Sequence, residues 1–161
     1  MLNSIGAEID DIKVPFQVKF LSQSKNFAVA ASLDKVFIWR LKITEKHEMS
    51  QLLLSSVGNS SKTIEIDQDG SNEITAICTS PNYFVIAREK GEIMRFSLPS
   101  MELENQYTFY GNKPTNIQLS SNSSRLSIID SNALLYIIDL DKIDEDGHGK
   151  GRTTHDPAIF L

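Results

Sequence analysis

The 161-residue sequence contains only one cysteine, Cys78, so no disulfide can form within the chain. A scarcity of cysteine favours a reducing compartment. The opening segment, MLNSIGAEIDDIK, carries acidic residues where a secretory signal peptide has a basic start and an apolar centre. No apolar stretch approaches the roughly 18 residues needed to cross a bilayer. We therefore expect a cytosolic chain with no direct insertion into a membrane.

Concentrated positive charge is missing too. The chain has 16 Lys and Arg against 21 Asp and Glu, a net charge of −5, and no block of basic residues. Nucleic acids and anionic membranes attract proteins through a concentrated positive field. The sequence therefore predicts no nucleic-acid partner.

The residue patterns that catalysis and phosphate binding require are absent. There is no G-x-S-x-G nucleophile elbow and no Cys–His signature. The segment GHGKGRTT (147–154) is rich in glycine but lacks the G-x-x-x-x-G-K-[ST] spacing of a phosphate loop. These absences predict a chain that is not an enzyme and binds no cofactor.

Two acidic segments are similar to calcium loops but fail the EF-hand frame. In DKIDEDGHG (141–149) and EIDQDG (65–70), Thr153 and Ala76 respectively stand where the bidentate Glu belongs. The three histidines are too few and too scattered for a zinc site, and Cys78 lies in an apolar stretch typical of a buried structural thiol. We expect no metal site.

A small group of basic residues, Arg88, Lys90 and Arg95, alternates with Glu89 and Glu92. This pattern favours cross-strand ion pairs on a solvated face over an anion-binding site.

What the sequence does contain is a repeat. Three stretches align without a gap: FAVAASLDKVFIWRL (27–41), FVIAREKGEIMRFSL (84–98) and LSIIDSNALLYIIDL (126–140). Apolar residues share columns, and a polar break rich in Asp, Asn, Gly and Ser divides each stretch. Each stretch therefore predicts a strand, a tight turn and a second strand.

The shared apolar columns predict the residues of the core. The first column holds Phe27, Phe84 and Leu126, and the tenth holds Val36, Ile93 and Leu135. The thirteenth column holds Trp39, Phe96 and Ile138, and the last holds Leu41, Leu98 and Leu140. Val29, Ile86 and Ile128 share the third column, and Ala30, Ala87 and Ile129 share the fourth.

Further strands are expected around the hairpins. Alternating apolar positions at Phe16/Val18/Phe20, Ile74/Ala76 and Ile117/Leu119 predict a strand before each hairpin. TIEIDQ (63–68) and QYTFYG (106–111) predict a fourth strand after the first two. A longer loop is expected at 45–62, with a short helical turn in MSQLLLSS (49–56).

Four strands in each unit are typical of WD40-type β-propeller blades. Trp39-Arg40, Phe96-Ser97 and Ile138-Asp139 occupy the place of the Trp-Asp pair in degenerate form. The predicted fold class is all-β, with about three blades in residues 1–141 and a flexible tail at 142–161. An ordinary meander or sandwich of three hairpins is the alternative. Because three blades cannot close a ring, we expect the chain to be part of a larger propeller.

The segment from Ala87 to Asp141 resembles the intraflagellar transport protein 121 family, also called the WD repeat-containing protein 35 family. The matching elements are Arg88-Glu89, Gly91, Ile93, Arg95 and Ser97-Leu98-Pro99, followed by NSSRL (122–126), IID (128–130) and DLD (139–141). Upstream, ITAICTS (74–80) also matches, and VAASLDKVFIWR (29–40) matches more weakly.

The resemblance implies a subunit of intraflagellar transport complex A, built from two WD-repeat propellers and a long helical-repeat region. It implies a non-catalytic scaffold that supports retrograde ciliary traffic and delivers membrane proteins to the cilium. The implied partners are other subunits of that complex and ciliary membrane cargo, at the cilium or flagellum and the basal body. The chain would match the closing blades of the second propeller.

The sequence departs from this pattern after DLDK, where IDEDGHGKGRTTHDPAIFL (143–161) does not match the family. An alternative function from another class is a coat-protein-like propeller that recognises peptide motifs in vesicle traffic. The same strands would serve either function.

The segment NSSRLSIID (122–130) fits the N-x-S/T acceptor for glycosylation. In a cytosolic chain we interpret Asn122, Ser123 and Ser124 instead as a turn whose side chains bind nearby backbone. Leu126, Ile128 and Ile129 then fall on core columns.

Our first prediction concerns the isolated chain, whose open stack of blades has two uncovered faces. Each exposed Leu- or Phe-sized side chain forfeits about 2 kcal/mol of burial. The chain should therefore be poorly soluble or oligomeric in size-exclusion chromatography. A monomer with a sharp, cooperative thermal transition would contradict this expectation.

Overall fold

The computed structural model describes residues 12–41, 61–66 and 70–141, which form eleven β-strands in three antiparallel sheets. The first sheet contains β1 (Phe20–Gln23), β2 (Phe27–Ala31), β3 (Lys35–Arg40) and β4 (Ser61–Glu65). The second contains β5 (Ile74–Thr79), β6 (Tyr83–Arg88), β7 (Glu92–Ser97) and β8 (Leu103–Thr108). The third contains β9 (Pro114–Leu119), β10 (Arg125–Asp130) and β11 (Leu135–Asp139).

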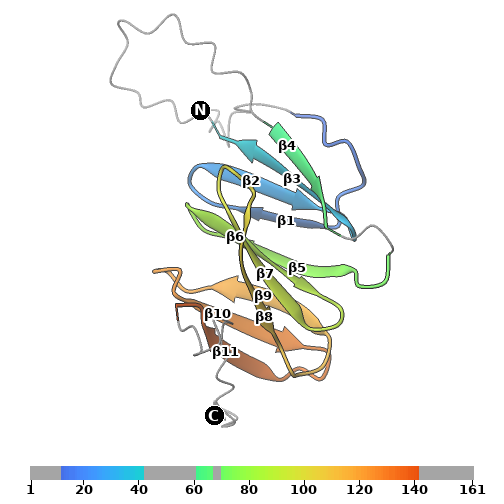
Figure 1. Cartoon of the computed structure of the whole chain (residues 1–161), viewed down its shortest axis with the longest axis vertical. Coiled ribbons are helices and arrows are strands. Elements are labelled where there is room, and N and C mark those ends of the chain that lie inside the picture. Colours follow the sequence, from blue (N-terminus) through green and yellow to red (C-terminus); the bar gives the residue numbers. More distant parts are fainter. Residues whose placement is uncertain (1–11, 42–60, 67–69, 142–161) are drawn as a thin grey trace, which may run out of the picture.

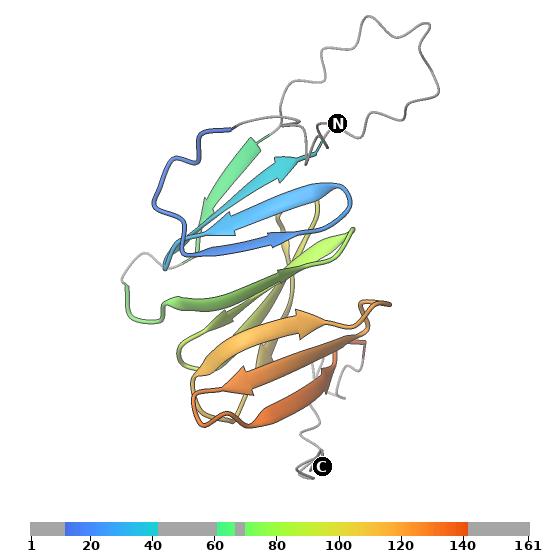
Figure 2. The same ribbon diagram turned by 180° about the vertical axis from the view of Figure 1, so that it is seen from behind.

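The three sheets stack on one another in chain order, as Figures 1 and 2 show from opposite sides. β5, the first strand of the middle sheet, lies against β1 on one side and β9 on the other. In a propeller the first strands of neighbouring blades surround a common axis in this way. The predicted all-β fold with WD40-type blades is confirmed. We call the three sheets blade 1, blade 2 and blade 3.

The predicted hairpins at 27–41, 84–98 and 126–140 correspond to β2–β3, β6–β7 and β10–β11. The strands expected before them are β1, β5 and β9, although β1 begins only at Phe20 and leaves Phe16 and Val18 outside it. The expected fourth strands of the first two blades are β4 and β8. Among the described residues, blade 3 has three strands.

Some expectations fall outside the described residues. They are residues 45–60 of the expected loop, the helical turn at 49–56 and the tail at 142–161. Within the part of the chain that the structure describes, no helix has the length and apolar character that a membrane crossing requires.

The hairpin turn of blade 1 is one residue shorter than the turns of the other two blades. Each turn lies between the last two residues that pair across its hairpin. Four residues lie between Ala31 and Val36 in blade 1, whereas five lie between Ala87 and Ile93 in blade 2 and between Ile129 and Leu135 in blade 3. The gapless sequence alignment therefore holds along the second strand of each hairpin and is one residue out along β2.

The shift changes which residue corresponds to Phe27. The sequence alignment places Phe27 with Phe84. In the structure Phe27 pairs with Arg40, and Tyr83 makes the corresponding pair with Ser97. Phe27 and Tyr83 therefore occupy equivalent positions in blades 1 and 2, and both point toward the next blade in the chain.

Two apolar cores hold the blades together. The core between blades 1 and 2 contains Phe27, Val29, Ala31, Val36, Ile38, Ile74, Phe84, Ile86, Phe96 and Met101. The core between blades 2 and 3 contains Ala76, Cys78, Tyr83, Val85, Ala87, Ile93, Tyr107, Phe109, Ile117, Leu126, Ile128, Ile138 and Leu140. In the first core the rings of Phe84 and Phe96 stack with centroids 5.0 Å apart. Because side chains alternate along a strand, blade 2 contributes one face to each core.

The outer rim of blade 2 is also fastened to blade 3. The hydroxyl of Tyr107, on β8, donates a hydrogen bond of 2.9 Å to the carbonyl of Leu140, just after β11. The blades are therefore joined near the axis, where β5 meets β9, and again at the rim.

Of the twelve residues in the first, tenth, thirteenth and last columns, eight have buried side chains: Phe27, Val36, Phe84, Ile93, Phe96, Leu126, Ile138 and Leu140. Three are partly buried: Trp39, Leu41 and Leu98. The last, Leu135, is exposed.

The expectation that Leu135 lies in a core is wrong, because its side chain is 52% exposed. Its column partners Val36 and Ile93 are fully buried, since each points toward a following blade that covers it. We call this side of a blade its forward face. The forward face of blade 3 also exposes Ile129 and Ile137 at 41% and 46%, so the expected burial of Ile129 is corrected too.

The turn after β10 is organised by Asp130, whose residue is almost completely buried. Its Oδ1 accepts hydrogen bonds from the backbone N–H of Asn132 (2.9 Å) and Leu134 (3.0 Å). Its Oδ2 accepts from the backbone and side-chain amides of Asn112 (3.3 and 3.2 Å) and from the Tyr136 hydroxyl (3.3 Å). One carboxylate thus ties the β10–β11 turn to the loop that precedes β9.

Burial alone would raise the pKa of Asp130, but the hydrogen bonds from Leu134, Asn112 and Asn132 outweigh it and hold the pKa below its ordinary value of 3.8. A carboxyl whose pKa is lower in the folded than in the unfolded chain stabilises the fold at higher pH. That contribution is complete above about pH 4 and is lost as the pH falls through the pKa of the folded state.

Two matched truncations compare a covered and an uncovered residue of the same alignment column, Ile93 and Leu135. Ile93→Ala should lower the free energy of unfolding by about 2–5 kcal/mol, because it opens a cavity in a closed core. Leu135→Ala should lower it by about 1 kcal/mol or less, because the side chain is already half exposed. Denaturant titrations at one fixed protein concentration, low enough to keep the chain monomeric, measure both. Equal losses would mean that Leu135 is covered in solution.

A pH titration tests the carboxylate. The free energy of unfolding of the wild type should fall as the pH drops below about 4. Asp130→Asn should be less stable than the wild type at neutral pH, and this difference should shrink at acid pH. Glu102→Gln, on an exposed turn, serves as the control. A stability difference for Asp130→Asn that stays constant down to acid pH would contradict the assignment.

Candidate functional site: a polar cavity between blades 2 and 3

The metal and thiol expectations can be compared with the structure only in part. Among the described residues, no group of three or more His, Cys, Asp or Glu could hold a metal ion. All three histidines and most of segment 141–149 lie outside that part of the chain. Cys78 lies on β5 and is buried as predicted, and burial raises the pKa of its thiol to about 12. The thiol therefore stays protonated and is a poor nucleophile.

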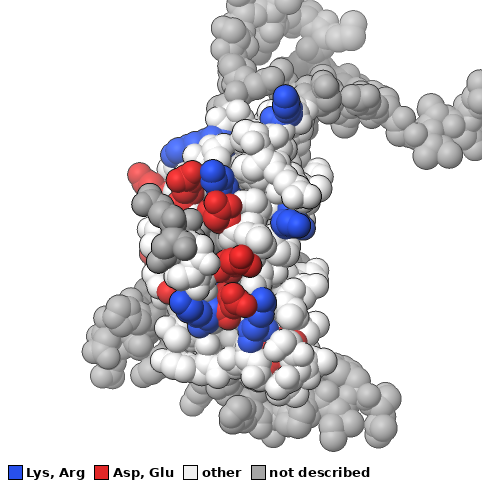
Figure 3. Space-filling view, turned by 90° about the vertical axis from the view of Figure 1, so that its right-hand side faces the viewer, with Lys and Arg blue, Asp and Glu red and all other residues white. Residues whose placement is uncertain are grey.

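The predicted ion pairs are present only in part: Arg88 and Glu92 pair with each other, whereas Arg95 and Glu89 bind Glu104 and Lys113, which lie outside the predicted group. Arg88 binds Glu92 at 2.7 Å across the β6–β7 turn, and Arg95 binds Glu104 at 2.8 Å between β7 and β8. Arg95 pairs with Val85, whereas Arg88 lies three residues further along β6, so the two arginines project from opposite faces of the blade. Figure 3 shows charges of both signs intermixed on one side of the molecule.

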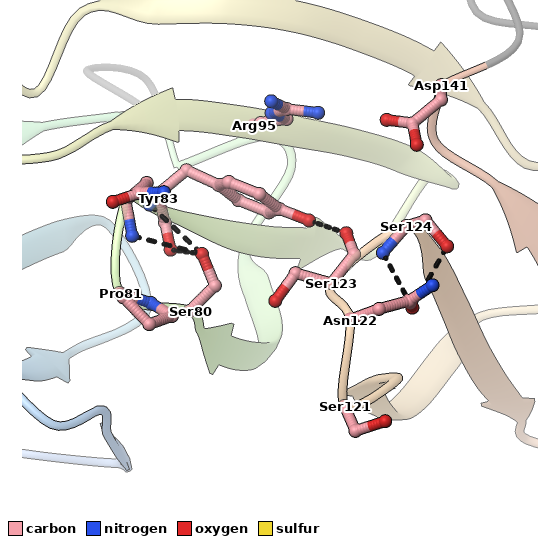
Figure 4. Close-up of a pocket in the computed structure, with 10 residues that line it drawn as sticks. Ser80, Pro81, Tyr83, Arg95, Ser121, Asn122, Ser123, Ser124 and Asp141 are labelled. Atoms are coloured by element: carbon pink, nitrogen blue, oxygen red, sulfur yellow. Dashed lines mark hydrogen bonds between the residues drawn. The ribbon is translucent and has the colours of Figure 1, made fainter.

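A polar cavity of about 360 Å³ lies where blade 2 meets blade 3 (Figure 4). Two turns form its walls, the β5–β6 turn and the β9–β10 turn, and a strand residue from β7 and the residue that ends blade 3 complete it. The lining residues are Ser80, Pro81, Asn82, Tyr83, Arg95, Ser121, Asn122, Ser123, Ser124 and Asp141.

Tyr83 spans the cavity from one blade to the other. Its hydroxyl donates a hydrogen bond to the backbone carbonyl of Ser123 (Figure 4). Burial raises the pKa of Tyr83 to about 12, although the nearby charge of Arg95 acts in the opposite direction. The hydroxyl is therefore protonated at neutral pH and acts as a donor.

Arg95 lies over the ring of Tyr83, with its guanidinium carbon 4.0 Å from the ring centroid. A cation in this position is attracted by the face of the ring. Its Nε donates to Glu104, and a guanidinium has further N–H groups at its ends. Asp141 lies further along the cavity in Figure 4, and no ion pair joins it to Arg95 in the described structure.

The β9–β10 turn is held in place by its own side chains. Asn122 Oδ1 accepts hydrogen bonds from the Ser120 hydroxyl (2.7 Å), the Ser124 backbone N–H (3.2 Å) and the Ser124 hydroxyl (3.0 Å). Ser123 has a φ of 61°, the left-handed conformation that such turns use. The interpretation of Asn122–Ser124 as a turn whose side chains bind nearby groups agrees with this geometry.

Among the described residues, the groups around the cavity can bind a ligand, and none of them form a pair of nucleophile and general base. They offer a guanidinium, a carboxylate, hydroxyls and amides, and none of the hydroxyls has a general base as its hydrogen-bond partner. Sequence reasoning placed Arg95 in an ion pair and in the family motif, and Asp141 in the DLD motif and an acidic segment, but it assigned neither of them, nor Tyr83, to a binding site. The available signal was Arg95 itself, which shares an alignment column with Ile38 and Ile137.

Comparison with known proteins agrees with the fold. The family model described as the WDR35 second beta-propeller matches residues 1–158. The chain belongs to the WD repeat-containing protein 35 family. It is 27% identical to human WD repeat-containing protein 35 over 170 residues, and 26% identical to the rat and mouse proteins over the same length. Each alignment covers 93% of this chain and 14% of the relative.

The chain therefore spans about a seventh of the length of these relatives. The resemblance stated from the sequence is confirmed for the family and for the second propeller. The family match also extends across the last strand of blade 3, so the exposed forward face of that blade belongs to the matched region.

Proposed function

We propose that this chain is a non-catalytic scaffold segment of an intraflagellar transport complex A subunit. It supports retrograde ciliary transport and the delivery of membrane proteins to the cilium through protein–protein contacts. Its partners are other subunits of that complex and ciliary membrane cargo. It acts in the cytoplasm, at the basal body and in the cilium or flagellum.

The observation that carries the proposal is the match of residues 1–158 to the second propeller of the WD repeat-containing protein 35 family. WD-repeat propellers of this kind typically act without catalysis. In this proposal, residues 1–141 form part of a larger propeller and residues 142–161 form its tail.

The exposed apolar residues of blade 3 support a contact-making role. Leu135, Ile137 and Ile129 lie together on the forward face, where the other blades have covered residues. Uncovered apolar patches of this kind mark protein–protein contacts. These residues would become covered when the segment joins a larger assembly.

Co-purification tests the proposal. The full chain, tagged and expressed in a ciliated cell, should bring down complex A subunits under native conditions and should concentrate at the basal body and cilium. The double variant Leu135→Glu/Ile137→Glu should reduce this recovery severalfold, because a charge cannot be covered by an apolar partner without a large desolvation cost.

Leu103→Glu is the matched control, since Leu103 is 48% exposed on β8 and lies away from the forward face of blade 3. Its recovery should equal that of the wild type. A chain that never enters a complex A assembly would refute the proposal. A chain that concentrates on Golgi membranes would favour the coat-protein-like alternative.

A further inference from the structure

Arg95 occupies a position that the repeat of this chain fills with isoleucine. The corresponding residues are Ile38 in blade 1 and Ile137 in blade 3, because each pairs with the same position of its neighbouring strand. Ile38 is buried in the core between blades 1 and 2. At the same place between blades 2 and 3, Arg95 carries a charge on a side chain that is only 21% exposed.

A second apolar position is replaced beside it. Phe27 packs in the core between blades 1 and 2, and its structural equivalent in blade 2 is Tyr83, which ends in a hydroxyl. Thus the two positions that close the first junction with apolar side chains carry polar groups at the second junction. A cavity lies there. Departures from a local rule that bring no evident gain in packing are expected at functional sites.

The β9–β10 turn, which forms the blade 3 wall of the cavity, also differs from the corresponding β5–β6 turn of blade 2. The turn of blade 2 closes with a hydrogen bond from Ser80 N–H to the Tyr83 carbonyl, whereas that of blade 3 runs from Ser120 N–H to the Arg125 carbonyl. The second turn is therefore two residues longer. The extra length carries the serine and asparagine side chains of residues 121–124 to the cavity, where Asn122 fixes them.

The charges around the cavity define what it fits. Arg95 has N–H groups beyond the Nε that Glu104 takes and can donate them to an acceptor, and the exposed Asp141 can accept from a donor. Because the two are not paired with each other, a ligand can satisfy both at once. A volume of about 360 Å³ falls at the lower end of the range typical of ligand pockets and suits a few residues of extended peptide.

We propose that this cavity binds a short polar peptide segment of a partner protein. An acidic side chain of the segment binds Arg95, a lysine binds Asp141, and the hydroxyls and amides of residues 121–124 bind its backbone. The inference rests on the proposed scaffold function in one respect only, namely that the occupant is a protein.

The probe is acetyl-Glu-Ser-Lys-amide, and its binding to the full chain is measured by saturation-transfer NMR, which tolerates self-association of the protein. The peptide should bind, whereas acetyl-Gln-Ser-Met-amide, which has the same length and no charge, should bind at least about tenfold more weakly. Charge-assisted hydrogen bonds account for a difference of this size.

Arg95→Ile is the decisive variant, because it restores the residue that blades 1 and 3 carry. It should fold and should bind the charged peptide about tenfold more weakly or worse. Arg95→Gln and Asp141→Asn give the same readout if Arg95→Ile fails to fold. Arg125→Gln, an exposed arginine on blade 3 outside the cavity lining, is the control and should bind as the wild type does.

Equal binding of the two peptides, or undiminished binding by the folded Arg95 variants, would overturn the assignment. The outcome is separable from the scaffold proposal. A chain that binds the charged peptide but enters no transport complex would refute the proposed function and leave the cavity assignment intact. A chain that enters the complex but does not bind the peptide would support the proposed function and overturn the cavity assignment.

Discussion

The structure depends on apolar packing between the faces of neighbouring blades. Each core lies between two sheets, so no blade closes a core of its own. Blade 2 shows this most completely: Phe84 and Phe96 face blade 1, while Val85 and Ile93 face blade 3. The hydrophobic effect stabilises both junctions, while the order of the sheets follows the order of their strands in the chain. Hydrogen bonds within each sheet fix register, but they do not hold one blade to the next.

The same dependence explains the two ends of the stack. The forward face of blade 3 exposes apolar residues at positions that the next blade covers in blades 1 and 2. At the other end, Trp39 corresponds to the buried Phe96 and Ile138, and its indole N–H finds no hydrogen-bond partner among the described residues. A buried donor without a partner is costly. Both outer blades thus carry, at the boundary of the described structure, residue types that are buried elsewhere in the stack.

Sequence reasoning predicted the fold well because burial repeats along the chain. The aromatic and aliphatic columns located all three hairpins, and turn residues located the breaks between their strands. The register of β2 was predicted one residue out, because a shorter turn in blade 1 offsets the alignment while leaving the second strand in step. The exposure of Leu135 was missed since a column states which way a side chain points and not whether a neighbour covers it.

The candidate site was much harder to predict. Its walls come from turns in two blades about forty residues apart, as the bond between Tyr83 and Ser123 illustrates. Serine and asparagine in turns are common, so their presence carries little information. Only Arg95, in a column of isoleucines, gave a local signal, and its meaning depended on knowing that the column faces another blade.

The bond between Tyr107 and Leu140 has a consequence for how the cavity exchanges its contents. Blades 2 and 3 are fastened near the axis by β5 and β9 and at the rim by this hydrogen bond, so the junction has no free side about which to hinge. A peptide of the kind we propose would therefore enter and leave through the open mouth of the cavity without separating the blades.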